Sequence, residues 1–169
     1  MTSSWYVSLI SFDGEGISKL LKINVIKAKS TNQAKKIDIS KNDGKLLGVP
    51  VGVKDIFNTE VYPTEMGSKL WKGHKAGNDA RCITYLKNEG CIIAGKTDTA
   101  EFAVHTPGKS LNPWNNNHVT GTSSGGSAVA VSSGMAPIST STQTSGSTIR
   151  PASYCGVYGM KPSFGLIPR

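Results

Sequence analysis

The last part of the chain lacks acidic side chains: residues 102–169 contain no aspartate or glutamate, and no histidine follows His118. Any chemistry in this segment must therefore run without a local carboxylate. A Ser-His-Asp triad in the hydrolase order needs an acid and then a histidine after its serine, so the sequence excludes it for Ser123. Long apolar runs are missing too, because no stretch of about 18 hydrophobic residues is present to span a membrane.

Cysteines are few and lie far apart, at Cys82, Cys91 and Cys155. Their spacing fits no metal site, and an odd number in a chain without an export signal indicates reduced thiols. The first residues have neither the basic start nor the continuous apolar stretch of a signal peptide. We therefore expect a soluble, globular protein of the cytoplasm that binds no metal.

The net charge of +8 raises the question of a nucleic-acid partner. Lysines are spread from Lys19 to Lys109, without the basic cluster of about five to eight residues, interleaved with aromatic residues, that is typical of nucleic-acid surfaces. We do not expect nucleic-acid binding from this distribution.

Turn residues and apolar periodicity divide the chain into helices and strands. The lysine-rich segment 28–44 predicts a helix that ends in a turn at 42–44, and "LLGVPVGVKD" predicts a strand that begins at Pro50. We treat residues 1–45 as an N-terminal helical segment and residues 46–169 as the main domain.

Helices and strands then follow one another along the chain. The segment "GNDARCITYLKNEG" predicts a helix that is capped by Asn78 or Asp79 and ends at Gly90. The remaining elements are a strand, then a helix followed by a strand, predicted at 91–95, 126–135 and 136–141. This order predicts an α/β fold class with a mixed β-sheet flanked by helices.

Residues 90–97 match the phosphate-loop pattern GxxxxGK[ST] letter for letter. That motif needs a strand before its first glycine and a flexible loop between the glycines. Here a helix is predicted before Gly90, and the residues between the glycines are themselves the predicted strand. We therefore reject nucleotide binding at this position.

The segment "GTSSGGSAVAVSSG", at 121–134, places serines and glycines next to a small-residue helix. It suits either a backbone cradle for an anion or buried hydroxyls arranged for nucleophilic chemistry. A serine nucleophile without histidine or carboxylate needs another base, and burial lowers the pKa of a lysine enough to provide one. Lys54 ends a glycine-valine strand and suits this role, although a lysine that extends into solvent is the plainer alternative.

Three ordered blocks, "GVPVGVKD", "GTSSGGSAVAV" and "TQTSGSTIRPASYCG", resemble the amidase signature family of serine hydrolases. The resemblance runs from about Lys45 to Pro168. It implies the amidase signature fold, no cofactor, and a Ser-cis-Ser-Lys triad that hydrolyses a carboxylic amide C–N bond through an acyl-enzyme.

By motif, the resemblance makes Ser147 the nucleophile, Ser123 the bridging serine and Lys54 the base. The peptide bond between Thr122 and Ser123 would be cis. Ser124 would have no part in the proton relay.

The loop after the last predicted strand resembles the oxyanion hole of the family. Its backbone N–H groups belong to Thr144, Ser145, Gly146 and Ser147. Arg150 would either meet an anionic substrate or pair within the loop. The chain departs from the family pattern at Thr122, where a glycine is usual, and at Gln143 and Ser145, where the family often has aspartate and glycine.

Proteins of this family continue for several hundred residues, so we expect a truncated chain with an open apolar face. We place a stand-alone amidase with a small-molecule amide substrate first. The A subunit of the glutamyl/aspartyl-tRNA amidotransferase and a catalytically silent remnant are the alternatives, and a homodimer is left open.

Overall fold

Four strands form one sheet in the computed structural model, which describes residues 4–9, 32–36 and 43–167. Their order across the sheet is β1-β4-β2-β3. The bounds of the strands are β1 Ser4–Leu9, β2 Pro50–Lys54, β3 Ile92–Thr97 and β4 Ile138–Gln143. Strand β2 is parallel to both of its neighbours, and β1 pairs with β4 in the antiparallel sense. This is the mixed α/β sheet that the sequence predicts.

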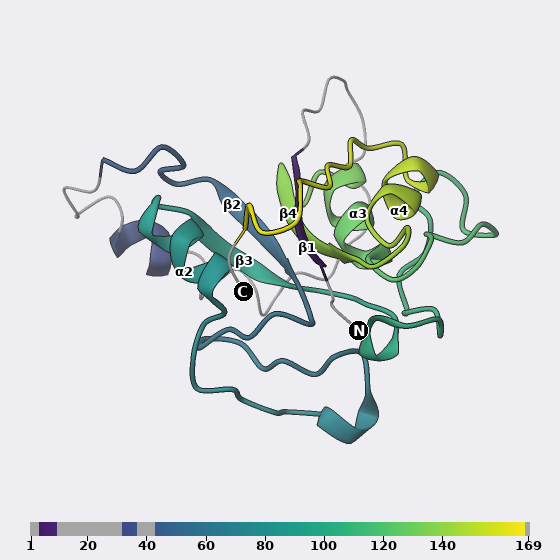
Figure 1. Cartoon of the computed structure of the whole chain (residues 1–169), viewed down its shortest axis with the longest axis horizontal. Helices are drawn as coiled ribbons and strands as arrows, with labels where there is room; N and C mark the ends of the chain where they lie inside the picture. The colour runs from purple at the N-terminus through teal and green to yellow at the C-terminus, as the bar shows by residue number, and fades with distance from the viewer. Residues whose placement is uncertain (1–3, 10–31, 37–42, 168–169) are drawn as a thin grey trace.

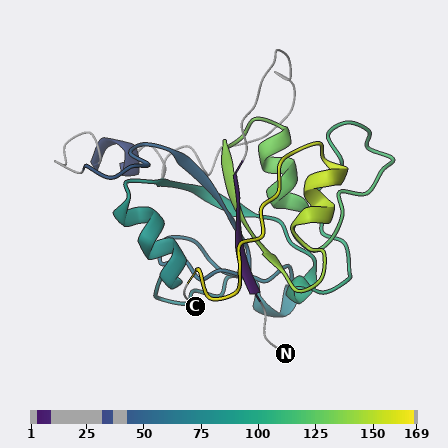
Figure 2. The ribbon, with the colours of Figure 1, turned by 45° about the horizontal axis from the view of Figure 1, so that its top comes forward.

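Helices cover both faces of the sheet, with α2 on one side and α3 and α4 together on the other (Figure 1, Figure 2). The bounds of the helices and 3-10 turns are α2 Arg81–Asn88, α3 Gly125–Ser132, α4 Ile149–Tyr154, η1 Lys69–Trp71 and η2 Glu101–Ala103. Residues 32–36 form a further short helix. In the part of the chain that the structure describes, no helix is long and apolar enough to cross a lipid bilayer.

An apolar core fills the space between α2 and the sheet. Its buried members come from β2, α2, β3 and the segment after β2, and they are Val53, Phe57, Tyr62, Cys82, Ile83 and Ile93. Successive residues of a strand point to opposite faces, so Val53 in this core places Lys54 on the face that carries α3. Strand β2 therefore delivers one lysine to the serine-rich side of the sheet.

Helix α3 approaches its neighbours closely because it begins with two glycines. A Cβ at Gly126 would lie 2.5 Å from the backbone N and O of Asp98, and a Cβ at Gly125 would overlap Thr120 Oγ1. Any larger residue would push the helix away from these loops. The glycines after the tandem serine therefore fix the position of the serine-rich segment.

Most of the predicted elements are present, with their ends shifted. The strand predicted at 91–95 is β3, the helix predicted at 126–135 is α3, and the strand predicted at 136–141 is β4. Strand β2 begins at Pro50, as predicted. Gly90 follows α2 with a φ of 85°, which fits its predicted role as the terminator of that helix.

The predicted cap of α2 is wrong, because neither Asn78 nor Asp79 occupies the N-cap position. That position belongs to Ala80, which makes no side-chain capping bond. The Asp79 carboxylate is engaged elsewhere, where it accepts hydrogen bonds from Glu60 N at 2.8 Å and from Lys87 Nζ at 2.6 Å. The carboxylate therefore joins the loop at Glu60 to the last turn of α2 and leaves the helix start uncapped.

The predicted helix at 28–44 is observed only over residues 32–36, since 28–31 and 37–42 lie outside the described residues. The predicted turn at 42–44 begins outside the described residues, and the structure has a turn at 45–48. Gly48 has a φ of 76°, and the chain closes there with a hydrogen bond from Val49 N to Leu46 O at 3.0 Å. The residue that accepts a positive φ therefore sets the position of the turn.

Strand β1 was not expected within residues 1–45, which the sequence predicts as helical. Its sequence, SWYVSL at Ser4–Leu9, contains aromatic and β-branched residues that favour strands. It pairs along its whole length with β4. The N-terminal segment therefore contributes an edge to the sheet, and the domain division at residue 45 stays a prediction.

Candidate active site

Lys54 is the last residue of β2, and its side chain is completely buried, with 0% exposure. Its ammonium nitrogen contacts hydroxyl groups from two other elements. Nζ lies 2.7 Å from Ser123 Oγ, 2.9 Å from Ser124 Oγ and 2.6 Å from Thr142 Oγ1. The structure therefore brings together the lysine and the bridging serine that the sequence singled out, and it does not place the lysine in solvent.

Burial lowers the pKa of Lys54 from its ordinary value of 10.5 to about 7. In the described part of the chain, no carboxylate forms an ion pair with this lysine to oppose the shift. A substantial fraction of Lys54 is therefore neutral at neutral pH. A neutral amine has a lone pair and can act as a base.

The hydrogen bonds around Nζ can be counted in both protonation states. A charged ammonium has three N–H groups, which match the three hydroxyl oxygens. A neutral amine has two N–H groups and a lone pair, so one hydroxyl must donate to it. The Ser124 hydroxyl donates to Thr142 O at 3.2 Å, which leaves the hydroxyls of Ser123 and Thr142 as donors to the amine.

The bridging serine lies in a constrained backbone segment. The peptide bond between Thr122 and Ser123 is cis, as the family resemblance implied. The carbonyl oxygen of Ser123 accepts hydrogen bonds from Ala100 N and from Thr99 Oγ1, each at 3.1 Å. Ser123 is 1% exposed, so its hydroxyl is directed toward Lys54 inside the protein.

Ser147 lies in the loop between β4 and α4 and is half-buried. Its carbonyl oxygen accepts a hydrogen bond from Ser124 N at 3.3 Å, which joins this loop to the tandem serine. Among the described residues, the hydroxyl of Ser147 has no hydrogen-bond partner, so its step to Ser123 is not closed. The structure therefore brings the three predicted residues into one region and forms one of the two relay contacts.

The loop that carries Ser147 has free backbone donors. The N–H groups of residues 144–147 have no acceptor within the described part of the chain. The loop is held instead by Gln143, whose Oε1 accepts from Thr148 N at 2.9 Å and from Ile149 N at 3.0 Å. A neutral amide thus fastens the start of α4 while leaving the preceding N–H groups open to a ligand.

Two residues of the site were missed by sequence reasoning. Ser124 was expected to lie outside the relay, and sequence reasoning did not predict that its hydroxyl lies 2.9 Å from Lys54 Nζ. Thr142 was not considered. The alternation of hydroxyl residues in "ISTSTQ" is a signal that could have found it, because a strand places Thr140 and Thr142 on the same face. Strand β4 lies beside β2 in the sheet, and the hydroxyl of Thr140 accepts a hydrogen bond from Lys54 N at 3.0 Å.

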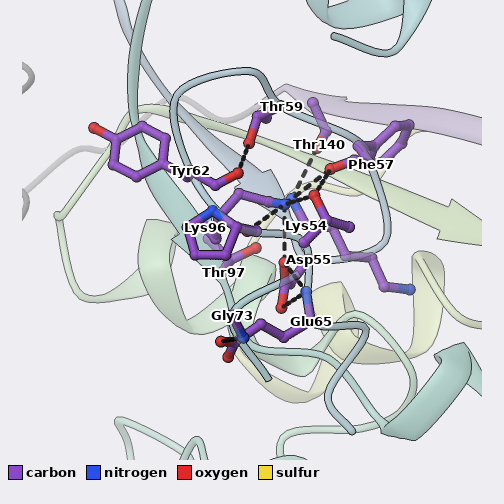
Figure 3. A network of polar contacts seen from close by, with 12 residues as sticks. Lys54, Asp55, Phe57, Thr59, Tyr62, Glu65, Gly73, Lys96, Thr97 and Thr140 are labelled. Atoms are coloured by element: carbon purple, nitrogen blue, oxygen red, sulfur yellow. Dashed lines mark hydrogen bonds and ion pairs between the residues drawn. The ribbon is translucent and has the colours of Figure 1, made fainter. Parts of the chain in front are cut away.

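A second, partly buried lysine lies on the neighbouring strand. Lys96, in β3, forms an ion pair with Asp55 at 2.8 Å and donates to Phe57 O at 2.9 Å and to Thr64 Oγ1 at 2.8 Å (Figure 3). Asp55 in turn accepts from Glu65 N at 3.1 Å. This network ties the segment after β2 to the sheet. The Lys96 amine is engaged by a carboxylate and is not available as a base.

The Amidase family model matches residues 16–169. The A subunit of the glutamyl-tRNA(Gln) amidotransferase of Methanococcoides burtonii is 43% identical over 142 residues, which cover 80% of this chain and 30% of that protein. The structure of the native peptide amidase of Stenotrophomonas maltophilia matches with a TM-score of 0.78 and 32% identity, over 84% of this chain and 32% of that one. The A subunit of the glutamyl-tRNA(Gln) amidotransferase of Thermotoga maritima matches with a TM-score of 0.68 and 31% identity, over 88% of this chain and 38% of that one.

These matches agree with the fold and with the order of the sequence blocks. The chain spans about a third of the length of the relatives it matches. Within that third, the family match begins well before Lys45, where the resemblance of the sequence blocks was first traced. The mixed sheet, the helices on its two faces and the family match lead to one conclusion: this chain belongs to the amidase family.

Proposed function

We propose that the chain carries the catalytic centre of an amidase, which hydrolyses a carboxylic amide C–N bond through an acyl-enzyme. Ser147 is the nucleophile, Ser123 relays the proton and Lys54 is the base. One observation carries the proposal: a fully buried lysine amine, without a carboxylate partner in the described chain, lies 2.7 Å from Ser123 Oγ. A lysine that served only structure would be expected to keep a counter-ion at such depth.

The proposed reaction begins with proton transfer. Neutral Lys54 accepts the proton of Ser123, and Ser123 accepts the proton of Ser147 while Ser147 Oγ bonds to the amide carbonyl carbon. The open N–H groups of residues 144–147 stabilise the oxyanion that forms. The C–N bond then breaks, and the amine leaves with the proton returned through Ser123. Water activated by the same relay hydrolyses the acyl group from Ser147.

The resting geometry requires one movement for this reaction. The Ser147 hydroxyl has no partner among the described residues, and the proposal requires it to turn toward Ser123 when substrate binds. Catalytic hydrogen bonds are often open without substrate and close in the complex. The backbone bond from Ser124 N to Ser147 O keeps the two segments together before this rotation.

Ser124 and Thr142 are positioning residues in this proposal. Both hold Lys54 Nζ from sides other than that of Ser123, at 2.9 and 2.6 Å. Neither hydroxyl takes part in the proposed proton relay. They fix the direction of the amine lone pair and balance the charge of the ammonium after it accepts the proton.

A fluorophosphonate probe tests the proposed nucleophile directly. The purified protein is incubated with an uncharged alkyl fluorophosphonate, and the adduct is located by peptide mass spectrometry. We expect an adduct on Ser147 that is absent from Ser147→Ala, together with ammonia release from simple primary amides. An adduct on Ser123, or one that persists in Ser147→Ala, would contradict the assignment.

A second candidate function is that of the A subunit of a tRNA-dependent amidotransferase, which the 43% identity to the Methanococcoides burtonii protein favours. Ammonia release from simple amides without ATP and tRNA supports the stand-alone amidase. Activity that depends on ATP and charged tRNA would support the amidotransferase. A chain that neither labels nor releases ammonia would be a silent remnant.

The substrate is proposed to be a small-molecule amide, and the protein is proposed to act in the cytoplasm. Cys82, Cys91 and Cys155 are buried and form no disulfide. Unbridged cysteines are compatible with a reducing compartment.

A further inference from the structure

The connection between β2 and α2 carries an exposed turn that has no part in the proposed catalytic centre. Residues 69–75, with the sequence KLWKGHK, are all exposed, and η1 lies within them. Figure 1 shows η1 at the lower edge of the molecule, away from α3 and α4. We propose that this 69–75 turn is a peripheral membrane-binding surface, where Leu70 and Trp71 enter the headgroup region of a bilayer that contains anionic lipids. Such binding needs no helix that spans the bilayer.

Two adjacent apolar side chains are presented by this turn. Leu70 is 87% exposed, the highest value among the large apolar side chains in the part of the chain that the structure describes. Trp71 is 37% exposed, and its ring meets that of His74 edge-on, with the ring centroids 4.4 Å apart. A single exposed apolar residue is ordinary on a protein surface. An exposed leucine next to a tryptophan is suited to a bilayer interface, because tryptophan prefers the headgroup level and leucine the acyl boundary.

Hydrogen bonds hold the turn in its exposed position. Thr64 N donates to His74 O at 2.8 Å and closes the base of the loop. Ser68 is buried, and it accepts from Leu70 N through Oγ at 3.3 Å and from Trp71 N through its carbonyl oxygen at 3.2 Å. The bonds of the loop itself therefore keep Leu70 and Trp71 at the surface, where a bilayer can reach them without a rearrangement of the fold.

The charge around these side chains is positive. The turn has three exposed lysines, which are Lys69, Lys72 and Lys75. None of them forms an ion pair within the described residues, and residues 66–78 contain no aspartate or glutamate. Glu65 lies just before this segment, but its Oε1 accepts from Gly73 N at 2.7 Å. The lysines complement an anionic lipid surface, because their ammonium groups meet the headgroups while the apolar side chains lie deeper.

A single-stranded nucleic acid is the other anionic partner to consider. Its bases stack on open aromatic faces along a basic groove. Here more than half of Trp71 is covered, and the most exposed apolar side chain is the aliphatic Leu70, which offers no stacking surface. Cytoplasmic leaflets carry anionic lipids, so such a bilayer is within reach of a protein in the cytoplasm, the location proposed above. The composition of the turn therefore favours lipid over nucleic acid.

Co-sedimentation with vesicles tests this surface. The full chain is mixed with vesicles of phosphatidylcholine alone and with vesicles in which about one third of the lipid is phosphatidylserine. We expect binding to the anionic vesicles only, and the affinity should fall about fivefold for each of the three lysines that is changed to glutamine. Leu70→Ser should lower it about tenfold or more, because an apolar side chain no longer enters the bilayer. No binding of the wild type to the anionic vesicles would overturn the proposal.

Lys109→Gln and Leu111→Ser are the matched controls, because they remove one exposed lysine and one exposed leucine from a segment outside the turn. Both variants should bind the anionic vesicles as the wild type does. If they weaken binding as much as the corresponding changes in the turn, the chain attracts lipid through its general charge and apolar surface, and the proposal is wrong. Ser147→Ala should also bind as the wild type does, so the outcome is independent of the proposed hydrolysis.

The fluorescence of Trp71 separates insertion from attraction of charge alone. Lipids brominated along their acyl chains should quench the emission of the bound wild type, and Trp71→Phe should lose most of this quenching. Bound protein without quenching would overturn the proposal. So would single-stranded oligouridine that binds more tightly than the anionic vesicles and depends on the same three lysines.

Discussion

Lys54 and Lys96 lie one register position apart on neighbouring parallel strands, where Lys96 pairs with Val53 and Lys54 pairs with Thr97. Consecutive residues point to opposite faces, so the two lysines enter opposite sides of the sheet. Lys96 meets a carboxylate and backbone carbonyls on the side of α2. Lys54 meets only hydroxyl groups on the side of α3.

The different partners have different consequences for charge. Burial lowers the pKa of both lysines, but for Lys96 the hydrogen bond and the charge of Asp55 oppose the shift. Nothing comparable opposes it for Lys54, and its pKa falls to about 7. Depth alone therefore does not make a base. A lysine becomes one where its neighbours can solvate the amine without supplying a negative charge.

The largest effect on activity is expected from substitutions of Lys54. Lys54→Ala and Lys54→Arg should each lower kcat/KM for a simple amide by about 10²–10⁴-fold, the usual range for losing acid–base assistance. Arginine should not rescue activity, because its guanidinium does not give up a proton in this pH range. Ammonia release per folded molecule is the measurement, and an active Lys54→Arg variant would contradict the role of the base.

A substitution of Lys96 should change the stability of the fold and not the catalytic chemistry. Lys96→Met leaves the mostly buried carboxylate of Asp55 without its partner, so the free energy of unfolding should fall by about 3 kcal/mol. The double variant Lys96→Met with Asp55→Leu should recover much of this loss, because it removes the unpaired charge. Denaturant unfolding measures both effects. A double variant no more stable than Lys96→Met would contradict the role of the ion pair.

The pH dependence of stability should distinguish the two lysines. The folded pKa of Lys54 lies below its unfolded value, so between about pH 7 and 10.5 the unfolded chain binds more protons and stability rises with pH. The slope from this group is about 1.4 kcal/mol per pH unit. Buried cysteines, whose pKa values are raised to about 11, act in the opposite direction at higher pH. The window from pH 7 to about 8.5 therefore excludes most of the cysteine contribution.

Lys54→Met is the comparison for this slope, since it keeps the length of the side chain and removes the titrating amine. The difference in unfolding free energy between the wild type and this variant should change with pH across the window. A difference that stays constant would show that Lys54 keeps its charge in the folded state.

The smallest effect is expected from Ser124. Its hydroxyl accepts from Lys54 and donates to Thr142 O, so it stabilises the ammonium more than the amine. Ser124→Ala should lower kcat/KM by about tenfold and move the midpoint of the pH–rate profile to lower pH. Ser127→Ala is the matched control, because Ser127 lies in the first turn of α3, three residues after Ser124, and donates its hydroxyl to Thr140 O at 2.8 Å without contacting Lys54. A midpoint that moves equally in both variants would argue against the positioning role.

Much of the fold follows from local signals in the sequence. Pro50, Gly90 and the glycines at 125 and 126 mark element ends or close contacts that only these residues permit. The cap of α2 and strand β1 could not be predicted, because both depend on partners distant in sequence. The Asp79 carboxylate accepts a hydrogen bond from the backbone N of Glu60, and β1 forms only where β4 lies beside it.

The residues of the site also differ in how well the sequence predicts them. Lys54 and the tandem serine carry a compositional signal, since a lysine at the end of an apolar strand and a dense serine-glycine segment are both unusual. Thr142 carries no such signal, because a threonine in a strand is ordinary. Its role arises only when β4 is placed beside β2 in register, which brings its hydroxyl 2.6 Å from Lys54 Nζ.

Direct titration of the Lys54 amine tests the central claim. The protein is labelled with ¹³C at lysine Cε, and the Lys54 resonance is assigned by its loss in Lys54→Arg. We expect its chemical shift to titrate with a pKa near 7. A Lys54 resonance that titrates near 10.5, the ordinary value for lysine, would contradict the account.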